Sequence, residues 1–412
     1  MLSYDEALTR ILAAVPGPLP TQTVALDAAQ NRVLASDIYA SESLPPFDNS
    51  AVDGYAVRLA DAAQASSTAP VRLLVTQTIA AGYAPTKPVL PGEAARILTG
   101  APVPPGADAL VMVEDTATDG DTVLLSDVPS AHFIRRAGSD LPRGALALAA
   151  GSILDGAALG LLAALNHTDL PCVRQPRVAV ITTGDEIISV GGPSLQPGQI
   201  RDANGPALQA VVHEAGAIPA LRFHVPDSLE DTRDALRAAS ECDVIVSCGG
   251  VSVGAFDFVK AALEAEGGNV DFWRVAIRPG KPLCFGRIPR KSRSDLAGSA
   301  LFFGLPGNPA SSLVTFELFV RPVLRKLGGY QSVSRSVLSV RLAAPMDHEP
   351  GRREFVRARL SFDGPTPNAT PTGAQTSHRL ASMLNVDALL VADENRGDYA
   401  VGETLPALWL RD

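Results

Sequence analysis

Cysteine is scarce in this chain of 412 residues, which contains only Cys172, Cys242, Cys248 and Cys284. None of the four forms a Cys-x-x-Cys pair, and most lie in or beside apolar runs that are typical of strands. A zinc site or a disulfide framework would require closer spacing. We therefore expect reduced thiols, most of them buried.

Basic residues are also few, because 35 Lys and Arg stand against 44 Asp and Glu, a formal net charge of −9. Nucleic acid, which attracts basic surfaces, is therefore not an expected partner. No uninterrupted apolar run is long enough to span a bilayer. The N-terminal MLSYDEALTRIL carries acidic residues early and indicates an amphipathic helix rather than a signal peptide. We expect a cytoplasmic protein with no membrane partner.

Glycine and proline are plentiful, at 35 and 33 residues, which indicates many loops and short strands. The chain is too long for a single core. Ser3 and Glu6 form a capping-box pattern that predicts a helix over residues 3–15.

The sequence pattern then changes along the chain. Short β-like runs separated by Pro/Gly turns extend from about residue 45 to 145, strands alternate with helices from 177 onwards, and β texture returns after about 331. We predict an α/β plus all-β protein, with a central doubly wound α/β domain flanked by β-rich domains. The predicted parts are residues 1–44 with 141–172 (helical or linker region), 45–140 (small β-rich domain), 173–329 (α/β domain) and 330–412 (C-terminal β-barrel-like domain).

Four strand ends in the α/β section carry unusual residues, and ligands of open α/β sheets bind at such ends. The first is TTGDE, in which Thr183 and Gly184 precede Asp185 and Glu186 at the expected rim of the sheet. An acidic cluster at a helix N-terminus is an equally good interpretation of this motif.

The second strand end is SCGGVSVGAFD, residues 247–257. Gly249, Gly250 and Ser252 belong to a loop whose backbone N–H groups are able to face an anion. It is not a Walker sequence, because no Gly-Lys-Ser/Thr closes it. Asp257 either caps the following helix or holds a cation that bridges to a phosphate. The density of glycine favours binding.

The third strand end is RVAIRPGKPL, residues 274–283, with Arg274, Arg278 and Lys281 close together. Three cations in an acidic protein suggest an anion seat, although a solvated run of charge is the alternative.

The fourth strand end is GLPGNPASS, residues 304–312. Asn308 suits a helix N-cap, Pro309 the first helical position and Ser311 the first turn, which leaves free N–H groups for an anion. Ordinary capping explains Asn308 and Pro309 equally well. Together the four loops predict an anion-binding cleft fringed by carboxylates, the combination that Mg²⁺-dependent phosphoryl or phosphoanhydride chemistry requires.

A further acidic turn, PPFDNSAVDGYA at residues 45–56, precedes all of these. Asp48 and Asp53 either stabilise the turn through their own backbone or hold a ligand.

These motifs, in this order, resemble the molybdopterin molybdenumtransferase (MoeA) family, to which the E domain of gephyrin belongs. PPFDNSAVDGYA is similar to its N-terminal signature, and the similarity extends over essentially the whole chain, including RILTGAPVPPGADALV and IRRAGSDL. The resemblance implies an elongated homodimer of four-domain subunits whose cleft lies between the molybdopterin-binding α/β domain of one subunit and the β-rich domains of the other. It implies insertion of molybdenum from molybdate into adenylylated molybdopterin, with Mg²⁺-dependent release of AMP. Molybdopterin adenylyltransferase and apo-molybdoenzymes are the implied protein partners.

The resemblance also implies site residues. Catalytic positions are Asp53, Asp140, Glu186, Asp227 and Asp257, with Lys281 added as a phosphate-neutralising cation, and Glu186 and Asp257 on the metal side. Substrate-binding positions are Thr99, Thr183, Gly184, Asp185, Gly249, Gly250, Ser252, Arg274, Arg278, Asn308, Pro309, Ser311, Arg352 or Arg353, and Ser377.

Some features depart from the family or stay open. Arg274 and Arg278 stand where relatives commonly have lysine, and a planar guanidinium differs in geometry from an ammonium. The alternation of REFVRARL predicts a strand face with Arg353, Arg357 and Arg359, which we interpret as solvated, with oxyanion contact as the alternative.

Two other functions compete with molybdenum insertion. The related molybdopterin adenylyltransferase shares the α/β domain but is typically a single domain, so the long β-rich flanks argue against it. A non-catalytic scaffold like gephyrin is the second alternative, and this chain lacks the additional domain and long linker of gephyrin.

Overall fold

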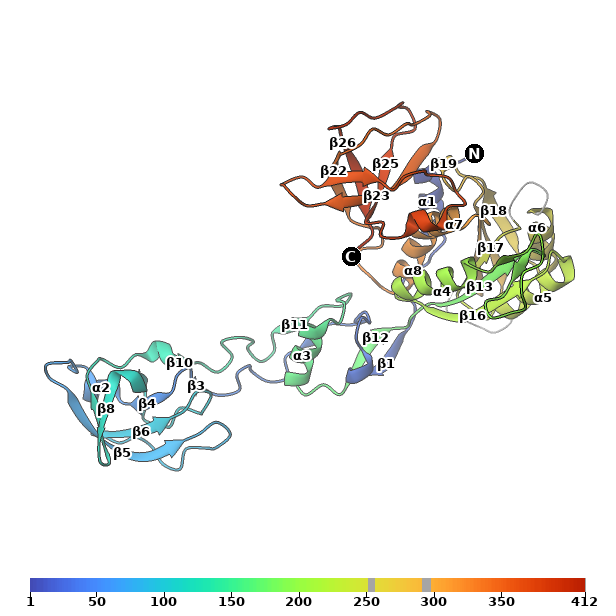
Figure 1. Ribbon diagram of the computed structural model, residues 1–412. Helices are drawn as coiled ribbons and strands as arrows, with labels where there is room; N and C mark the ends of the chain where they lie inside the picture. The colour runs from blue at the N-terminus through green and yellow to red at the C-terminus, as the bar shows by residue number, and fades with distance from the viewer. Residues whose placement is uncertain (251–255, 291–297, 412) are drawn as a thin grey trace. The chain divides into compact units, whose positions relative to one another are not determined.

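The computed structural model of the protein describes residues 1–250, 256–290 and 298–411, and the side chains of residues 256–258 are outside the description. The chain forms two compact units (Figure 1). The first comprises Met1–Ser36, Ala150–Leu159 and Thr168–Asp412, and the second comprises Asp37–Ala149 and Gly160–His167. None of the helices in the described ranges combines the length and the apolar character that a bilayer crossing requires. The four-part division given above stays a prediction.

A six-stranded sheet in the order β16-β13-β17-β21-β20-β18 forms the centre of the first unit. Its strands are β13 (Arg177–Thr183), β16 (Ile218–Val225), β17 (Val244–Cys248), β18 (Asn269–Trp273), β20 (Cys284–Pro289) and β21 (Ser299–Leu305). Neighbours from β16 to β21 are parallel, whereas β21, β20 and β18 pair antiparallel. The sheet is therefore parallel at its centre, as its apolar strands predicted, with an antiparallel edge.

The central strand β13 is buried on both faces, which explains its unbroken apolar sequence. Val178 and Val180 pack with Leu208 of α4 (Asn204–Glu214) on one face. Ala179 and Ile181 pack with α5 (Leu229–Ala239) and α6 (Phe256–Ala265) on the other (Figure 1). The sheet is thus doubly wound. All four cysteines are free and buried, as predicted.

The N-terminal helix α1 (Tyr4–Ala13) belongs to the same core. The predicted capping box is present, since Ser3 N donates to Glu6 Oε2 at 2.9 Å and Glu6 N donates to Ser3 Oγ at 3.3 Å. Tyr4 packs on Phe319 and Phe355. This contact ties α1 to the π-helical turn Phe316–Val320, which lies between α7 (Pro309–Thr315) and α8 (Arg321–Leu327), as well as to the tail sheet.

The tail sheet has the order β19-β23-β24-β22-β26-β25, and β25 also pairs with β23, which closes it into a small barrel-like sheet. Its strands are β19 (Ile277–Arg278), β22 (Val337–Leu342), β23 (Arg353–Ser361), β24 (Asn368–Pro371), β25 (Ala388–Ala392) and β26 (Thr404–Trp409). The short β19 comes from the α/β section and runs parallel to β23, with Arg278 opposite Glu354. The RPGK turn therefore starts inside the tail sheet.

The second unit contains a six-stranded sheet in the order β7-β4-β6-β5-β9-β8, in which β5 and β6 are parallel. Its strands are β4 (Gly54–Val57), β5 (Val71–Ile79), β6 (Glu93–Ile97), β7 (Ala109–Met112), β8 (Thr116–Asp119) and β9 (Thr122–Leu125), with α2 (Leu59–Ala62) beside them. Shorter pairs are β3 (Asn49–Ser50) with β10 (Ile134–Arg135) and β2 (Ile38–Tyr39) with β11 (Leu146–Leu148). The first unit also holds the pairs β1 (Thr21–Ala25) with β12 (Asp169–Val173) and β14 (Ile187–Ile188) with β15 (Ile200–Arg201). Helix α3 (Gly156–Ala164) has residues in both units.

Candidate functional site

The carboxyl end of β13 brings Glu186 against the backbone of the turn. Gly184 has φ +143°, and a Cβ there would lie 2.5 Å from Glu186 Oε2. A side chain at this position would displace the carboxylate, so the glycine is required for the observed approach. The rim position predicted for Asp185 and Glu186 follows directly from where β13 ends.

Three carboxylates interact at this rim. Asp227 N donates to Asp185 Oδ1 at 3.1 Å. Partial burial, and then the charges of Asp185 and Glu186, raise the pKa of Asp227. Such a concentration of negative charge favours a cation at the same rim.

Mg²⁺ can be tested against this donor set. The described residues contain no group of three or more His, Cys, Asp or Glu side chains arranged to hold a metal ion by themselves. Mg²⁺, however, is usually held by one or two carboxylates together with substrate phosphates, and not by a complete protein cage. The carboxylates of the rim fit that mode. The side chain of Asp257, the other predicted metal ligand, is outside the described residues.

The glycine-rich loop after β17 lies against the end of β13. Gly249 and Gly250 have φ values of +96° and +66°, and a Cβ on Gly249 would lie 2.7 Å from Thr183 Oγ1. Thr183 Oγ1 is buried and has no hydrogen-bond partner in the described part of the chain. The two predicted loops are therefore brought together, and Thr183 keeps a hydroxyl available for a ligand. Ser252 is outside the described residues.

Asn308 occupies the predicted N-cap position of α7, but its side chain is used elsewhere. Its side chain makes no capping bond to α7; instead Nδ2 donates to Ser377 Oγ at 2.9 Å. Ala310 N also donates to Ser377 O, at 3.1 Å. Pro309 is the first residue of α7, as predicted, and Ser311 is buried in it. This long-range contact brings Ser377 to the strand-end loops.

The three cations of the RPGK segment have different surroundings. Arg274, at φ +117°, stacks on the ring of Trp273 with 4.2 Å from its guanidinium carbon to the ring centre. Arg278 Nε lies 3.5 Å from Glu354 Oε1. Lys281 is exposed and has no ion-pair partner among the residues that the structure describes. Lys281 is thus the cation of the three whose charge is least compensated.

The two arginines of GRREF, Arg352 and Arg353, also have different bonding partners. Arg353 Nε donates to Glu394 Oε2 at 2.8 Å, and its Nη1 donates to Asp5 Oδ1 at 3.0 Å. Burial alone would lower the pKa of Arg353, but these hydrogen bonds raise it above its usual value. Arg352 is half-buried and has no such partner in the described ranges. Of the two, Arg352 retains a charge free for a ligand.

Arg357 is the residue that sequence reasoning misjudged. The predicted solvated face is wrong at this position, because the Arg357 side chain is 0% exposed. Its Nη2 donates to Ala374 O and Thr376 O at 3.5 and 3.4 Å, while Nε and Nη1 are buried without a partner in the described residues. Burial lowers its pKa. The signal was in the sequence: Arg357 shares a strand face with Phe355, a core residue.

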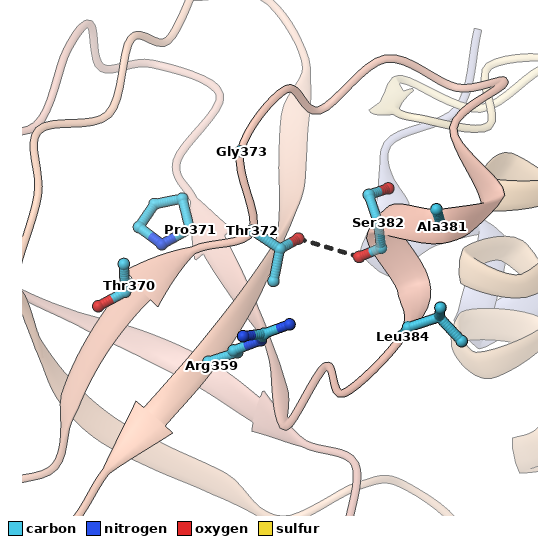
Figure 2. Close-up of a pocket in the computed structure, with 8 residues that line it drawn as sticks. All are labelled: Arg359, Thr370, Pro371, Thr372, Gly373, Ala381, Ser382 and Leu384. Carbon is cyan, nitrogen blue, oxygen red and sulfur yellow. Dashed lines mark hydrogen bonds between the residues drawn. The ribbon is translucent and has the colours of Figure 1, made fainter.

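The segment that carries Ser377 is fixed at its start by Thr372. Thr372 Oγ1 donates to Ser382 O at 3.0 Å, a bond drawn in Figure 2 between two residues that line a cavity of about 330 Å³. Arg359 points into the same cavity, whose lining contains no acidic side chain (Figure 2). Together, Thr372 and Arg357 hold the segment from two sides and so determine where Ser377 is presented.

The second unit places Asp53 and Thr99 together. Thr99 N and Oγ1 both donate to Asp53 Oδ1, at 2.7 and 2.8 Å, and these bonds lower the pKa of Asp53. Both residues are exposed, as is Asp140, whose carboxylate has no hydrogen bond or ion pair within the described residues. Asp48 instead accepts from Arg136 Nη1 at 2.6 Å and from Ala137 N at 2.8 Å. In the acidic turn, therefore, Asp48 stabilises the chain and Asp53 is presented to solvent.

Almost the whole length of the chain is similar to known proteins. Three family models match: "MoeA N-terminal region (domain I and II)" at residues 2–166, "Probable molybdopterin binding domain" at 179–326 and "MoeA C-terminal region (domain IV)" at 339–410. The molybdopterin molybdenumtransferase of Haemophilus influenzae is 36% identical over 98% of both chains. Molybdopterin molybdenumtransferase 2 of Mycobacterium tuberculosis is 41% identical over 96% of both. A solved MoeA protein of Pyrococcus horikoshii has 30% identity and a TM-score of 0.82, over 99% of this chain and 100% of its own.

Proposed function

Because the chain belongs to the molybdopterin molybdenumtransferase family, we propose that it inserts molybdenum from molybdate into adenylylated molybdopterin and releases AMP. It is an enzyme of the transferase class that acts in molybdenum cofactor biosynthesis. The observation that supports the proposed site is that carboxylates and glycine loops lie at the carboxyl ends of β13 and β17, and that Ser377 is hydrogen-bonded to Asn308 in the loop after β21. The alternatives, adenylyltransferase and scaffold, are not favoured, because relatives matched over their full length are named as molybdenumtransferases.

The pterin and pyrophosphate are assigned to the glycine-rich side of this rim. Gly250 is assigned a backbone N–H contact and Ser252 a hydroxyl contact. Gly249, whose own N–H donates to Leu305 O at 3.3 Å, is assigned for the close approach that its missing side chain allows, and the unpartnered hydroxyl of Thr183 faces it. The remaining contacts on this side are assigned to Gly184, Asp185, Asn308, Pro309 and Ser311.

Mg²⁺ is assigned to Glu186 and Asp257, with Asp185 and Asp227 close enough to Glu186 to add to the negative potential. When bound, the metal ion neutralises phosphate charge at the bond that is hydrolysed. The residues of the chain hold and orient the phosphates around it.

Molybdate is a tetrahedral oxyanion and suits guanidinium, N–H and hydroxyl donors. Arg274, Arg352 and Ser377 are assigned to it, and Arg357 is added on account of its two unpartnered buried nitrogens beside the Ser377 segment. Arg278 and Lys281 are assigned to phosphate.

Asp53, Thr99 and Asp140 of the second unit are assigned catalytic or substrate-binding roles in the same reaction. The functional form that we propose is a cytoplasmic homodimer, which receives its substrate from a molybdopterin adenylyltransferase and passes its product to apo-molybdoenzymes. The bonds from Thr99 lower the pKa of Asp53 and keep it ionised, which suits a carboxylate that binds a cation or accepts a hydrogen bond from the substrate.

The test mixes the purified protein with adenylylated molybdopterin, Mg²⁺ and molybdate, and measures AMP together with the activity gained by an apo-molybdoenzyme. We expect both to appear, and we expect chelation of Mg²⁺ to stop AMP release. Binding of the adenylate without any cleavage would contradict the proposal.

A further inference from the structure

Both ring nitrogens of His348 face oxygen acceptors in the interior of the tail domain. Nδ1 lies 3.0 Å from Glu354 Oε2, and Nε2 lies 3.0 Å from Asp393 O. The imidazole is almost completely buried. Because a carbonyl oxygen only accepts, Nε2 must carry a proton and donate it to Asp393 O.

The other nitrogen must also donate if Glu354 is ionised. Glu354 is buried, and its second oxygen, Oε1, lies 3.5 Å from Arg278 Nε, so a permanent cation favours the carboxylate form. A carboxylate only accepts, so in this arrangement Nδ1 donates to Glu354 Oε2. Glu354 therefore lies between the His348 imidazole and the Arg278 guanidinium.

The other charged groups around the pair agree with this assignment. Asp398 Oδ1 accepts from His348 N at 2.7 Å, and Glu349 lies 3.9 Å from Arg278 Nη1. The ring of Tyr399 packs 6.2 Å from the imidazole, centre to centre. His348 thus lies beside Asp398 as well as Glu354, and Arg278 lies between Glu354 and the exposed Glu349.

This network reaches the substrate side through β19. Arg278 pairs with Glu354 across the β19–β23 ladder and begins the RPGK turn. A guanidinium can bond Glu354 through Nε and still present its terminal nitrogens to an anion, whereas a lysine has one nitrogen for both tasks. The arginine at position 278 therefore matches the buried glutamate behind it.

We propose that His348 is a positioning residue that, through Glu354, holds the Arg278 guanidinium by its Nε edge and so aims its terminal nitrogens at the anionic substrate. The proposal rests on the proposed function for the identity of that substrate. The hydrogen-bond network itself does not depend on the reaction.

The first test measures the protonation of His348 directly, by nitrogen NMR of the imidazole rings in the ¹⁵N-labelled full chain at pH 7. His348→Asn identifies the His348 signals by their loss. We expect both ring nitrogens of His348 to be protonated in the wild type and the ring to become neutral in Glu354→Gln. A neutral ring in the wild type would overturn the proposal, whether or not the protein releases AMP.

The second test compares two amides at position 348. The asparagine amide lies near the place of Nδ1 and is able to donate to Glu354, whereas the glutamine amide reaches toward Asp393 O and leaves Glu354 without its donor. We expect His348→Gln to raise the KM for adenylylated molybdopterin about tenfold, the scale of one hydrogen bond to a charged group, and His348→Asn to raise it less. His213→Gln, at an exposed histidine at the end of α4, is the control and should change nothing.

A double-mutant cycle separates positioning from general stability. In an Arg278→Lys background, His348→Gln should have no further effect on KM, because the guanidinium that Glu354 holds has been replaced by an ammonium. Equal effects of His348→Gln in both backgrounds would overturn the proposal. If the wild type releases no AMP, the proposed function fails, and the same cycle on calorimetric binding of the adenylate still decides whether His348 acts through Arg278.

Discussion

The carboxylates at the two edges of the central sheet have opposite surroundings. At the amino edge, Asp243 is buried between Arg174 and Arg290, with Arg290 Nη2 at 2.8 Å and Arg174 Nη1 at 2.9 Å. At the carboxyl edge, Asp185, Glu186 and Asp227 lie together without an arginine or lysine bonded to them in the described residues. At the amino edge, two arginines of the fold neutralise the charge of Asp243. At the carboxyl edge, the carboxylate charges stay available to a ligand.

The pKa values follow the same division. Burial alone would raise the pKa of Asp243, but hydrogen bonds from Arg174, Arg177 N and Arg290 lower it. The pKa of Asp227 is raised, because partial burial and the like charges of Asp185 and Glu186 outweigh the lowering effects of a backbone hydrogen bond and His224. One edge of the sheet is therefore built for stability, and the other retains unfavourable charge interactions that a bound cation would relieve.

The largest expected effect is on catalysis at the carboxyl edge. Glu186→Gln removes one charge with little change in shape, and we expect AMP release to fall by at least about a hundredfold, the scale of losing one electrostatic contact to a transition state. The unfolding temperature should hardly change. The measurement is a paired assay of AMP and thermal unfolding, with the exposed Glu214→Gln of α4 as the matched control. Full activity in Glu186→Gln would refute its assigned role.

The next effect is on stability at the amino edge. Asp243→Ala leaves Arg290, whose side chain is 2% exposed, without its buried partner, and should lower the free energy of unfolding by about 3 to 5 kcal/mol. Asp234→Ala removes an exposed partner of Arg237 and should change it by less than about 1 kcal/mol. Denaturant titration measures both. Similar losses in the two variants would mean that the amino-edge network has no special structural role.

This contrast also shows what the sequence could and could not predict. The carboxyl-edge loops were predictable, because each motif follows an apolar strand and parallel strands end at one edge. The meeting of Asn308 with Ser377 and the entry of the two-residue β19 into the tail sheet were not, because both depend on pairings between residues far apart in the chain. Arg357 was misjudged for a related reason: alternation places it on one face of a strand but does not say what that face packs against.

A moderate effect is expected from salt. Lys281 is exposed and without an ion-pair partner among the described residues, so its attraction to an anionic substrate is open to screening. We expect the Kd for the adenylate, measured by calorimetry, to rise several-fold between about 0.05 and 0.5 M monovalent salt. The slope should be smaller in Lys281→Gln, and the buried Asp243 network should respond little. An affinity that does not depend on salt would argue against Lys281 as an anion seat.

The smallest expected effect is a gain in stability at the carboxyl edge. Since the pKa of Asp227 is higher in the folded state than in the unfolded chain, the unfolded state binds fewer protons in the window just above the usual aspartate value, and stability falls as pH rises through it. Asp227→Asn should therefore raise the free energy of unfolding slightly at pH 7, by no more than about 0.5 kcal/mol for so exposed a group, and the gain should vanish below pH 3. Asp243→Asn should show the opposite pH dependence, with a loss at neutral pH that disappears in acid, because its folded-state pKa is lowered. Thermal unfolding of both variants across this pH range measures the sign of each pH dependence directly. A stabilised Asp243→Asn or a destabilised Asp227→Asn at pH 7 would contradict the contrast between the two edges.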